Sequence, residues 1–145
     1  MPERSSPETI VAFDFGLRRI GVAVGQDVTG SASPLGIVSN GTKGPDFERI
    51  ATLIKEWRPN RLIVGMPLHI DGSPGQLEPS IGEFVVALER FELPIDRVDE
   101  RHTSQEAEQA LINARQAGSR GRIKKEHIDA AAAVFIAERY LLKNL

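Results

Sequence analysis

The sequence predicts an α/β domain built on one mixed five-stranded sheet with helices on both faces. Three short apolar segments joined by turns come first, at residues 10–13, 20–24 and 33–38, and they indicate an antiparallel meander. Two further apolar segments, 62–64 and 95–98, each follow a helical pattern, so we expect them to extend the same sheet. The fully apolar segment 62–64 is typical of a strand in the middle of a sheet covered on both faces.

Four helices are expected between and after these strands. The first begins at Pro45 and Asp46 and ends at Trp57, the second spans 77–91, the third starts at the capping box of residues 103–106, and the last spans 126–142. Apolar spacing predicts that Trp57 belongs to the core. The same spacing predicts the side chains that the last helix buries: Ile128, Ala132, Phe135, Ile136 and Leu142.

The bulk composition is that of a globular protein. With 145 residues, 41% hydrophobic and 26% charged, we expect a flexible tail over residues 1–9 and a single domain over 10–145. The absence of cysteine excludes disulfides, zinc–thiolate sites and thiol nucleophiles. The first residues lack the apolar core of a signal peptide, and the longest apolar run, 130–137, is too short to cross a bilayer. We therefore expect a cytoplasmic protein with no membrane partner.

Charge is distributed unevenly along the chain. The net charge of -2 argues against a protein that coats nucleic acid by charge alone. However, residues 115–125 contain no acid and carry a group of bases, which suits local binding to phosphates or a solvated turn. These bases are Arg115, Arg120, Arg122, Lys124 and Lys125.

Three carboxylates occupy positions that require explanation. Asp14 lies within the first strand, where burying a lone ionised carboxylate costs several kcal/mol. Glu100 follows the strand at 95–98, and Asp129 lies in the first turn of the last helix, directly before four alanines that allow close packing on the sheet. Oxygen ligands without cysteine select a hard cation such as Mg²⁺ or Mn²⁺. We therefore expect the three acids to hold metal.

Two of these acids also have an ordinary structural interpretation. Asp129 could stabilise a helix N-terminus, and Glu100 could form a surface ion pair with Arg101. Asp99 adjoins Glu100 but points to the opposite face of an extended chain, so only one of the two can face the site. Residue chemistry alone does not choose between them.

Acids beside a basic loop are the pattern that a metal-dependent nuclease needs. Two ions about 3.5–4 Å apart can activate water and stabilise the leaving oxygen of a phosphodiester. Arg120, Arg122, Lys124 and Lys125 lie just before Asp129 and would hold the nucleic-acid backbone.

Four segments carry a family resemblance. They are AFDFGLRRIGVAVG at 12–25, IVGMPLHIDGSPG at 63–75, VDERHTSQEAEQAL at 98–111 and KKEHIDAAAAVFI at 124–136. In this order and spacing they resemble the YqgF/RuvX family of Holliday-junction-resolvase-like proteins, also called pre-16S rRNA nucleases. The resemblance implies an RNase H-like fold and a set of metal-binding catalytic acids, with Glu100 preferred to Asp99. These acids are Asp14, Glu100 and Asp129.

The resemblance also implies residues that hold phosphates, namely Arg18, Arg101, Thr103 and Lys124. The expected function is a Mg²⁺- or Mn²⁺-dependent endonuclease with a two-metal mechanism that processes the 5′ end of pre-16S rRNA. One alternative is a Holliday junction resolvase on branched DNA, which would need a symmetric dimer. Another is a non-catalytic nucleic-acid-binding or ribosome-assembly factor. Nucleic acid is the expected partner, and the sequence leaves monomer and homodimer open. An actin-like ATPase is disfavoured because the chain is too short for two domains.

Overall fold

The computed structural model describes residues 8–66, 78–99 and 125–143, and of residues 78, 99, 125–129 and 143 it describes the backbone. Within these ranges the sheet is formed by six strands in the order β4-β3-β2-β1-β5-β6. The strands are β1 (Thr9–Asp14), β2 (Arg19–Gln26), β3 (Ser31–Gly41), β4 (Gly44–Pro45), β5 (Arg61–Met66) and β6 (Ile95–Asp99). The helices are α1 (Phe47–Trp57), α2 (Glu78–Leu88), the 3₁₀ helix η1 (Glu89–Phe91) and α4 (Lys125–Lys143).

Strand directions confirm the predicted mixed sheet. β1, β2 and β3 form the antiparallel meander, and β5 and β6 add to β1 in parallel. The prediction of five strands was one short, because β4 pairs with the end of β3 over only two residues. Such a strand has no apolar pattern of its own; it exists through its pairing across the turn between Gly41 and Gly44.

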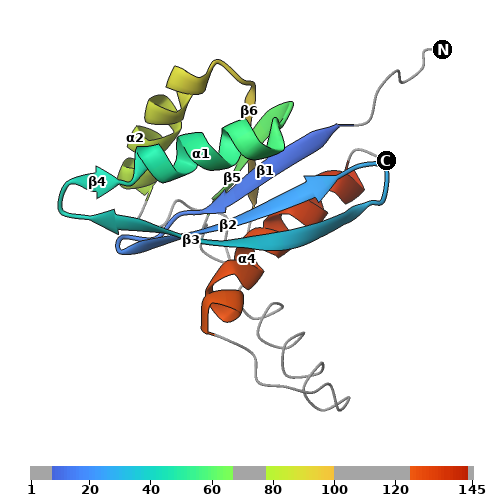
Figure 1. Ribbon diagram of the computed structural model, residues 1–145, viewed down its shortest axis with the longest axis horizontal. Coiled ribbons are helices and arrows are strands. Elements are labelled where there is room, and N and C mark those ends of the chain that lie inside the picture. Colours follow the sequence, from blue (N-terminus) through green and yellow to red (C-terminus); the bar gives the residue numbers. More distant parts are fainter. Residues whose placement is uncertain (1–7, 67–77, 100–124, 144–145) are drawn as a thin grey trace.

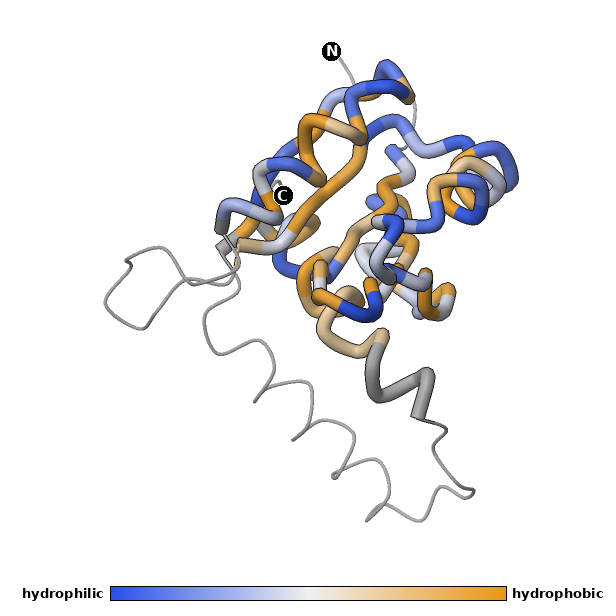
Figure 2. The backbone as a smooth tube through the Cα atoms, turned by 90° about the vertical axis from the view of Figure 1, so that its left-hand side faces the viewer, coloured by the Kyte–Doolittle hydropathy of each residue, from blue (hydrophilic) through white to orange (hydrophobic). Residues whose placement is uncertain are grey.

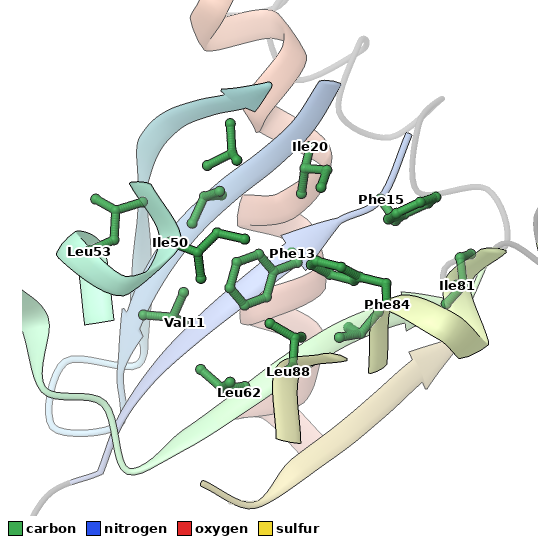
Figure 3. Close-up of a cluster of buried hydrophobic side chains, with 13 residues drawn as sticks. Val11, Phe13, Phe15, Ile20, Ile50, Leu53, Leu62, Ile81, Phe84 and Leu88 are labelled. Atoms are coloured by element: carbon green, nitrogen blue, oxygen red, sulfur yellow. The ribbon is translucent and has the colours of Figure 1, made fainter. Parts of the chain in front are cut away.

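Helices cover both faces of the sheet, as predicted (Figure 1). α1 and α2 lie on one face and α4 crosses the other. Side chains along β1 alternate between the two layers. Val11 and Phe13 belong to the cluster under α1 and α2, whereas Ile10 and Ala12 belong to the cluster under α4. Figure 3 shows the first cluster, with Phe13 at its centre.

The central strands carry apolar side chains on both faces of the sheet. Leu62, Ile63 and Val64 of β5 have no exposed surface, which confirms the prediction of a strand covered on both faces. The hydropathy-coloured tube shows these strands as a hydrophobic centre with more hydrophilic turns around it (Figure 2).

Local signals set the ends of α1. The carboxylate of Asp46 accepts a hydrogen bond from the backbone N–H of Arg49 at 3.1 Å, and Arg58 ends the helix in a left-handed conformation with φ 50°. The prediction that Trp57 is buried was wrong, since it is 37% exposed. It is the last residue of the helix, whereas the side chains packed on the cluster end at Ile54.

α4 agrees with the predicted range to within one residue at each end. Ala132 and Ile136 are buried as predicted and Phe135 is half-buried, whereas Leu142 is 68% exposed and Leu141 is buried in its place. Four consecutive alanines carry little information on which face is apolar, so the packing on the sheet decides it. The predicted contribution of Ile128, like the predicted helix at 103–114, lies outside the side chains that the structure describes.

The first strand begins slightly earlier than predicted. Thr9, placed in the tail by the sequence, is the first residue of β1. The backbone N–H of Glu8 donates to Asp27 at 3.0 Å, and the N–H of Asp27 donates back to the carbonyl of Glu8. In the part of the chain that the structure describes, no helix combines the length and hydrophobicity needed to cross a membrane.

Candidate active site at the carboxyl edge of the sheet

The three parallel strands end at one edge of the sheet. β1 ends at Asp14, β5 at Met66 and β6 at Asp99, and the last two are paired in register. Open α/β sheets place their ligands at this carboxyl edge. The edge is therefore the part of the molecule where candidate catalytic residues should be sought.

Asp14 lies on the side of the sheet that α4 covers. It continues the alternation of Ile10 and Ala12, which pack under α4, and it is half-buried. Its partner on β2 is Gly21, so the position opposite Asp14 carries no side chain. This leaves space beside the carboxylate.

The backbone of α4 brings Asp129 to the same side. Asp129 is four residues before Ala133 and seven before Ile136, two fully buried positions, so its backbone position falls on the sheet-facing side of the helix. The structure describes the backbone of Asp129 but not its side chain. The four alanines after it are all buried, as the predicted close packing requires.

The third acid, Glu100, lies outside the described residues. Val98, two positions earlier, packs in the cluster under α4. The choice of Glu100 over Asp99 therefore stays a prediction from the family resemblance. The predicted phosphate-binding residues also lie largely outside the described side chains: Arg101, Thr103, Arg120, Arg122 and Lys124 are not described, and Lys125 is described only as the first backbone position of α4.

A pocket of about 210 Å³ surrounds Asp14. It is bordered by the turn from β1 to β2 and by the neighbouring strands, with two exposed arginines, Arg18 and Arg19, at its rim. A carboxylate beside two guanidinium groups can hold a metal ion and a phosphate next to each other. The prediction included Arg18 but missed Arg19, although the two are adjacent. The lining residues are Asp14, Gly16, Arg18, Arg19, Gly21 and Ile37.

The turn that carries Arg18 is held by a buried amide that the sequence analysis also missed. The Asn40 side chain donates to the carbonyl of Gly16 at 2.6 Å, and the Asn40 backbone N–H donates to the carbonyl of Arg18 at 2.9 Å. Gly16 is required here, because a Cβ atom would lie 2.5 Å from the carbonyl oxygen of Arg19. The Asn40-Gly41 pair indicated a turn, and nothing in it indicated a partner 24 residues earlier.

The donor set fits a hard cation. Asp14 supplies carboxylate oxygens, and the chain has no thiolate that would select a softer metal. Among the side chains that the structure describes, no group of three potential ligands forms, since Asp14 is the one predicted ligand with a described side chain.

A second polar cluster lies at the opposite edge, where the parallel strands begin. Arg61 bonds Glu8 at 3.2 Å and Asp96 at 3.3 Å, and the Tyr140 hydroxyl donates to Glu8 at 3.5 Å. Burial and the nearby charge of Glu8 raise the pKa of Tyr140. For Arg61, burial alone lowers the pKa, but the hydrogen bond to Glu8 and the surrounding charges raise it overall. This cluster joins the residue before β1 to β5, β6 and α4 and is structural.

The sheet order and the helices on both faces are those of an RNase H-like fold. Among solved structures, Thermus thermophilus RuvC in complex with a Holliday junction substrate superimposes with a TM-score of 0.59 at 17% identity, covering 94% of this chain and 95% of that one. The fowlpox virus resolvase bound to Holliday junction DNA gives a TM-score of 0.57 at 12% identity, covering 94% and 99%. At these identities the likeness concerns the fold.

The chain belongs to the RuvX family of nucleases. The family model described as "RuvX: Holliday junction resolvase" matches residues 8–143. A Burkholderia lata protein is 43% identical over 134 residues, covering 92% of this chain and 88% of its own, and a Paraburkholderia xenovorans protein is 44% identical with 92% and 87% coverage. Both relatives carry the name "Putative pre-16S rRNA nuclease". The resemblance drawn from the four sequence segments is thereby confirmed.

Proposed function

We propose that this protein is a divalent-metal-dependent endonuclease that hydrolyses phosphodiester bonds in the 5′ region of pre-16S rRNA, acting in the cytoplasm. The observation that carries the proposal is the position of Asp14. It is a half-buried carboxylate at the carboxyl edge of the sheet, in a pocket rimmed by Arg18 and Arg19, on the face crossed by the helix that contains Asp129.

The acids and bases have separate tasks in this proposal. Asp14, Glu100 and Asp129 would hold Mg²⁺ or Mn²⁺, and bound metal supplies activation of water and stabilisation of the leaving oxygen, with two ions expected. Arg18 would hold a phosphate beside Asp14, on a turn that Asn40 keeps in place. The remaining candidates for phosphate contact are Arg101, Thr103, Arg120, Arg122, Lys124 and Lys125.

RNA is preferred as substrate because the relatives that cover nearly the whole chain are named for pre-16S rRNA. The second candidate is branched DNA, which is favoured by the description of the family and by the fold of the resolvases. Cutting two opposed strands of a junction would require a two-fold symmetric dimer. A non-catalytic binding factor is the third candidate.

One experiment separates these candidates. Labelled pre-16S rRNA and a four-way DNA junction are incubated with the protein in Mn²⁺ and in chelator, using wild type, Asp14→Asn and Asp96→Asn. Asp96→Asn makes the same chemical change at the opposite edge of the sheet and serves as the matched control.

We expect wild type and Asp96→Asn to cut RNA with metal only, and Asp14→Asn to be slower by about 100-fold or more, because a metal ligand is lost. Cleavage of the junction in preference to RNA would favour the resolvase. Equal rates for Asp14→Asn and wild type, or no cleavage of either substrate, would refute the catalytic proposal.

A further inference from the structure

A second pocket lies on the other side of the turn that carries Arg18. It has a volume of about 360 Å³, within the range of small-ligand sites, and it opens between the end of β3, the start of α1 and the exposed side of α2. Its walls are mostly aromatic or apolar. The residues that matter for the argument are Phe15, Leu17, Asn40, Phe47, Glu83 and Phe84.

The two pockets share one turn. Asp14, Gly16 and Arg18 border the pocket of the candidate active site, whereas Phe15 and Leu17 border the aromatic pocket. Alternate residues of the same five-residue segment therefore face two adjoining spaces at the carboxyl edge. The two pockets lie on opposite sides of this turn, so a strand whose phosphate lies near Arg18 would pass over the edge of the turn for one of its bases to enter the aromatic pocket.

The aromatic rings are held firmly. The ring centroid of Phe84 lies 5.2 Å from that of Phe15 and 6.4 Å from that of Phe47, with Phe13 at 5.5 Å. Phe84 and Phe15 meet at one end of the buried cluster (Figure 3). The Arg90 guanidinium lies 4.1 Å from the centroid of Phe47. Phe15 is 8% exposed and Phe84 3%, so these two rings form a rigid floor, and the half-buried Phe47 is the most accessible ring of the pocket.

Leu17 is exposed although the turn around it is fixed. Its side chain is 63% exposed, while Asn40 bonds the carbonyls of the residues on both sides of it. A large apolar side chain held over an aromatic pocket offers a surface for an apolar face, and a base presents such a face.

The formal charge among the described lining residues of this pocket is negative. Among the lining residues that the structure describes, Glu83 carries the formal charge and Ser80 adds a hydroxyl. A carboxylate repels phosphate but accepts hydrogen bonds from the amino edge of a base. The chemistry therefore differs from that of the adjoining pocket with Arg18 and Arg19.

We propose that the aromatic pocket receives one unstacked base of the nucleic-acid strand whose phosphate lies at Asp14. This inference rests on the proposed function and adds a subsite that would select unpaired or easily unpaired nucleotides next to the cut. Unstacking a base costs little free energy in loops and at strand ends, and such a subsite would direct cleavage to those places.

The test measures binding separately from cleavage. The cut in labelled pre-16S rRNA is first mapped with wild type. Anisotropy in Ca²⁺ then gives the affinity for intact RNA and for RNAs with one abasic position at a time around the cut. Leu17→Ala removes an exposed wall, and Gly41→Met adds a side chain at the rim, where a Cβ atom meets nothing within 4 Å.

Matched controls make the same kinds of change elsewhere. Val28→Ala truncates another exposed apolar side chain, 69% exposed, in the turn between β2 and β3 at the far end of β2. Gly82→Met adds a side chain to α2 at a position that also meets nothing within 4 Å and is not part of the lining.

We expect wild type to bind roughly tenfold more weakly when one particular position is abasic, the loss expected for one stacked base. Leu17→Ala and Gly41→Met should bind intact RNA about tenfold more weakly and should no longer distinguish that abasic RNA, while both controls behave as wild type. The subsite is overturned if binding affinity falls equally at every abasic position. It is also overturned if the two variants weaken the binding of intact and abasic RNA equally. In either case the proposed nuclease function is unaffected as long as the RNA is still cut. If no RNA is bound or cut, the proposed function and the subsite fail together.

Discussion

The buried amide of Asn40 fixes the turn between the two pockets. Its side chain donates to the Gly16 carbonyl, and the residue is only 6% exposed. Asn40→Ala leaves that carbonyl without its donor, so we expect a loss of about 1–3 kcal/mol in the free energy of unfolding. Cleavage should also slow, because Arg18 is no longer held. Urea denaturation and the RNA assay measure the two effects.

Asn60 provides the matched control for Asn40. Its side chain accepts from the backbone N–H of Thr9 at 2.8 Å, and its own N–H donates to the Thr9 carbonyl at 2.7 Å, but this pair is exposed at the opposite edge. Asn60→Ala should cost about 0.5–1.5 kcal/mol and leave cleavage unchanged. If both variants slow cleavage equally, Asn40 has no special relation to the site.

The carboxyl group of Glu138 is expected to make stability depend on pH. Burial on α4 raises its pKa above the ordinary value of 4.5, so the folded state binds this proton more tightly than the unfolded chain. The ionised form therefore lowers stability at neutral pH, and this cost disappears as pH falls through the raised pKa and below 4.5.

Glu138→Gln should raise the free energy of unfolding at pH 7 by about a few tenths of a kcal/mol, a small effect because water screens the half-buried group. The gain should vanish below the ordinary carboxyl pKa, as measured by urea denaturation across pH. A gain for Glu138→Gln that is equal at all pH values would contradict the explanation.

At the scale of elements, the distance of α4 from the sheet depends on small residues. Ala133 has no exposed surface, and a Cβ atom at Gly25 of β2 would lie 3.1 Å from Leu141. Ala133→Leu should displace the helix and cost about 1–3 kcal/mol by overpacking. Since Asp129 lies one turn earlier, cleavage should fall by more than the loss of folded protein explains.

Leu142→Ala is the control on the same helix. This side chain is 68% exposed, so its truncation should change stability by less than about 0.5 kcal/mol. Denaturation and cleavage, measured on Ala133→Leu and Leu142→Ala, separate the effect on stability from the effect on catalysis. Normal activity of folded Ala133→Leu would show that the position of α4 is not important for catalysis.

The sequence predicted those elements whose residues carry their own pattern. The apolar segments of β1, β2 and β5 and the capped helix α1 have such patterns, and all were found near their predicted bounds. β4 was missed because its two residues become a strand only by pairing with Asn40 and Gly41. The choice of Leu142 over Leu141 failed because alanines do not mark a helix face, so packing sets the phase.

The candidate site could be predicted where a residue conflicts with its surroundings. Asp14 was predicted as a site residue because an acid in an apolar strand needs compensation, and strand alternation then gives its side of the sheet. Arg19 and Asn40 were missed for a different reason. Their relation to Asp14 and Gly16 arises from the pairing of β2 with β3 and from the turn, neither of which is visible in local spacing.

At the scale of the whole molecule, the two edges of the sheet serve different purposes. The edge where the parallel strands begin is closed by the bonds among Arg61, Glu8, Asp96 and Tyr140. The carboxyl edge is hollowed by two pockets around one turn. The proposed function places a cation at the half-buried carboxylate of the second edge, Asp14, and binding there would be coupled to folding.

Metal should therefore stabilise the whole fold through the carboxyl edge. A ligand that binds only the folded state adds about 2.7 kcal/mol at 100 times its Kd, which corresponds to a rise of roughly 8 °C in Tm for a chain of this size. We expect this rise in wild type and Asp96→Asn with Mn²⁺ at constant ionic strength, and a much smaller one in Asp14→Asn. Calorimetry measures it without relying on activity. An equal rise in all three proteins would mean that metal binds elsewhere, and Asp14 would then have to be explained without it.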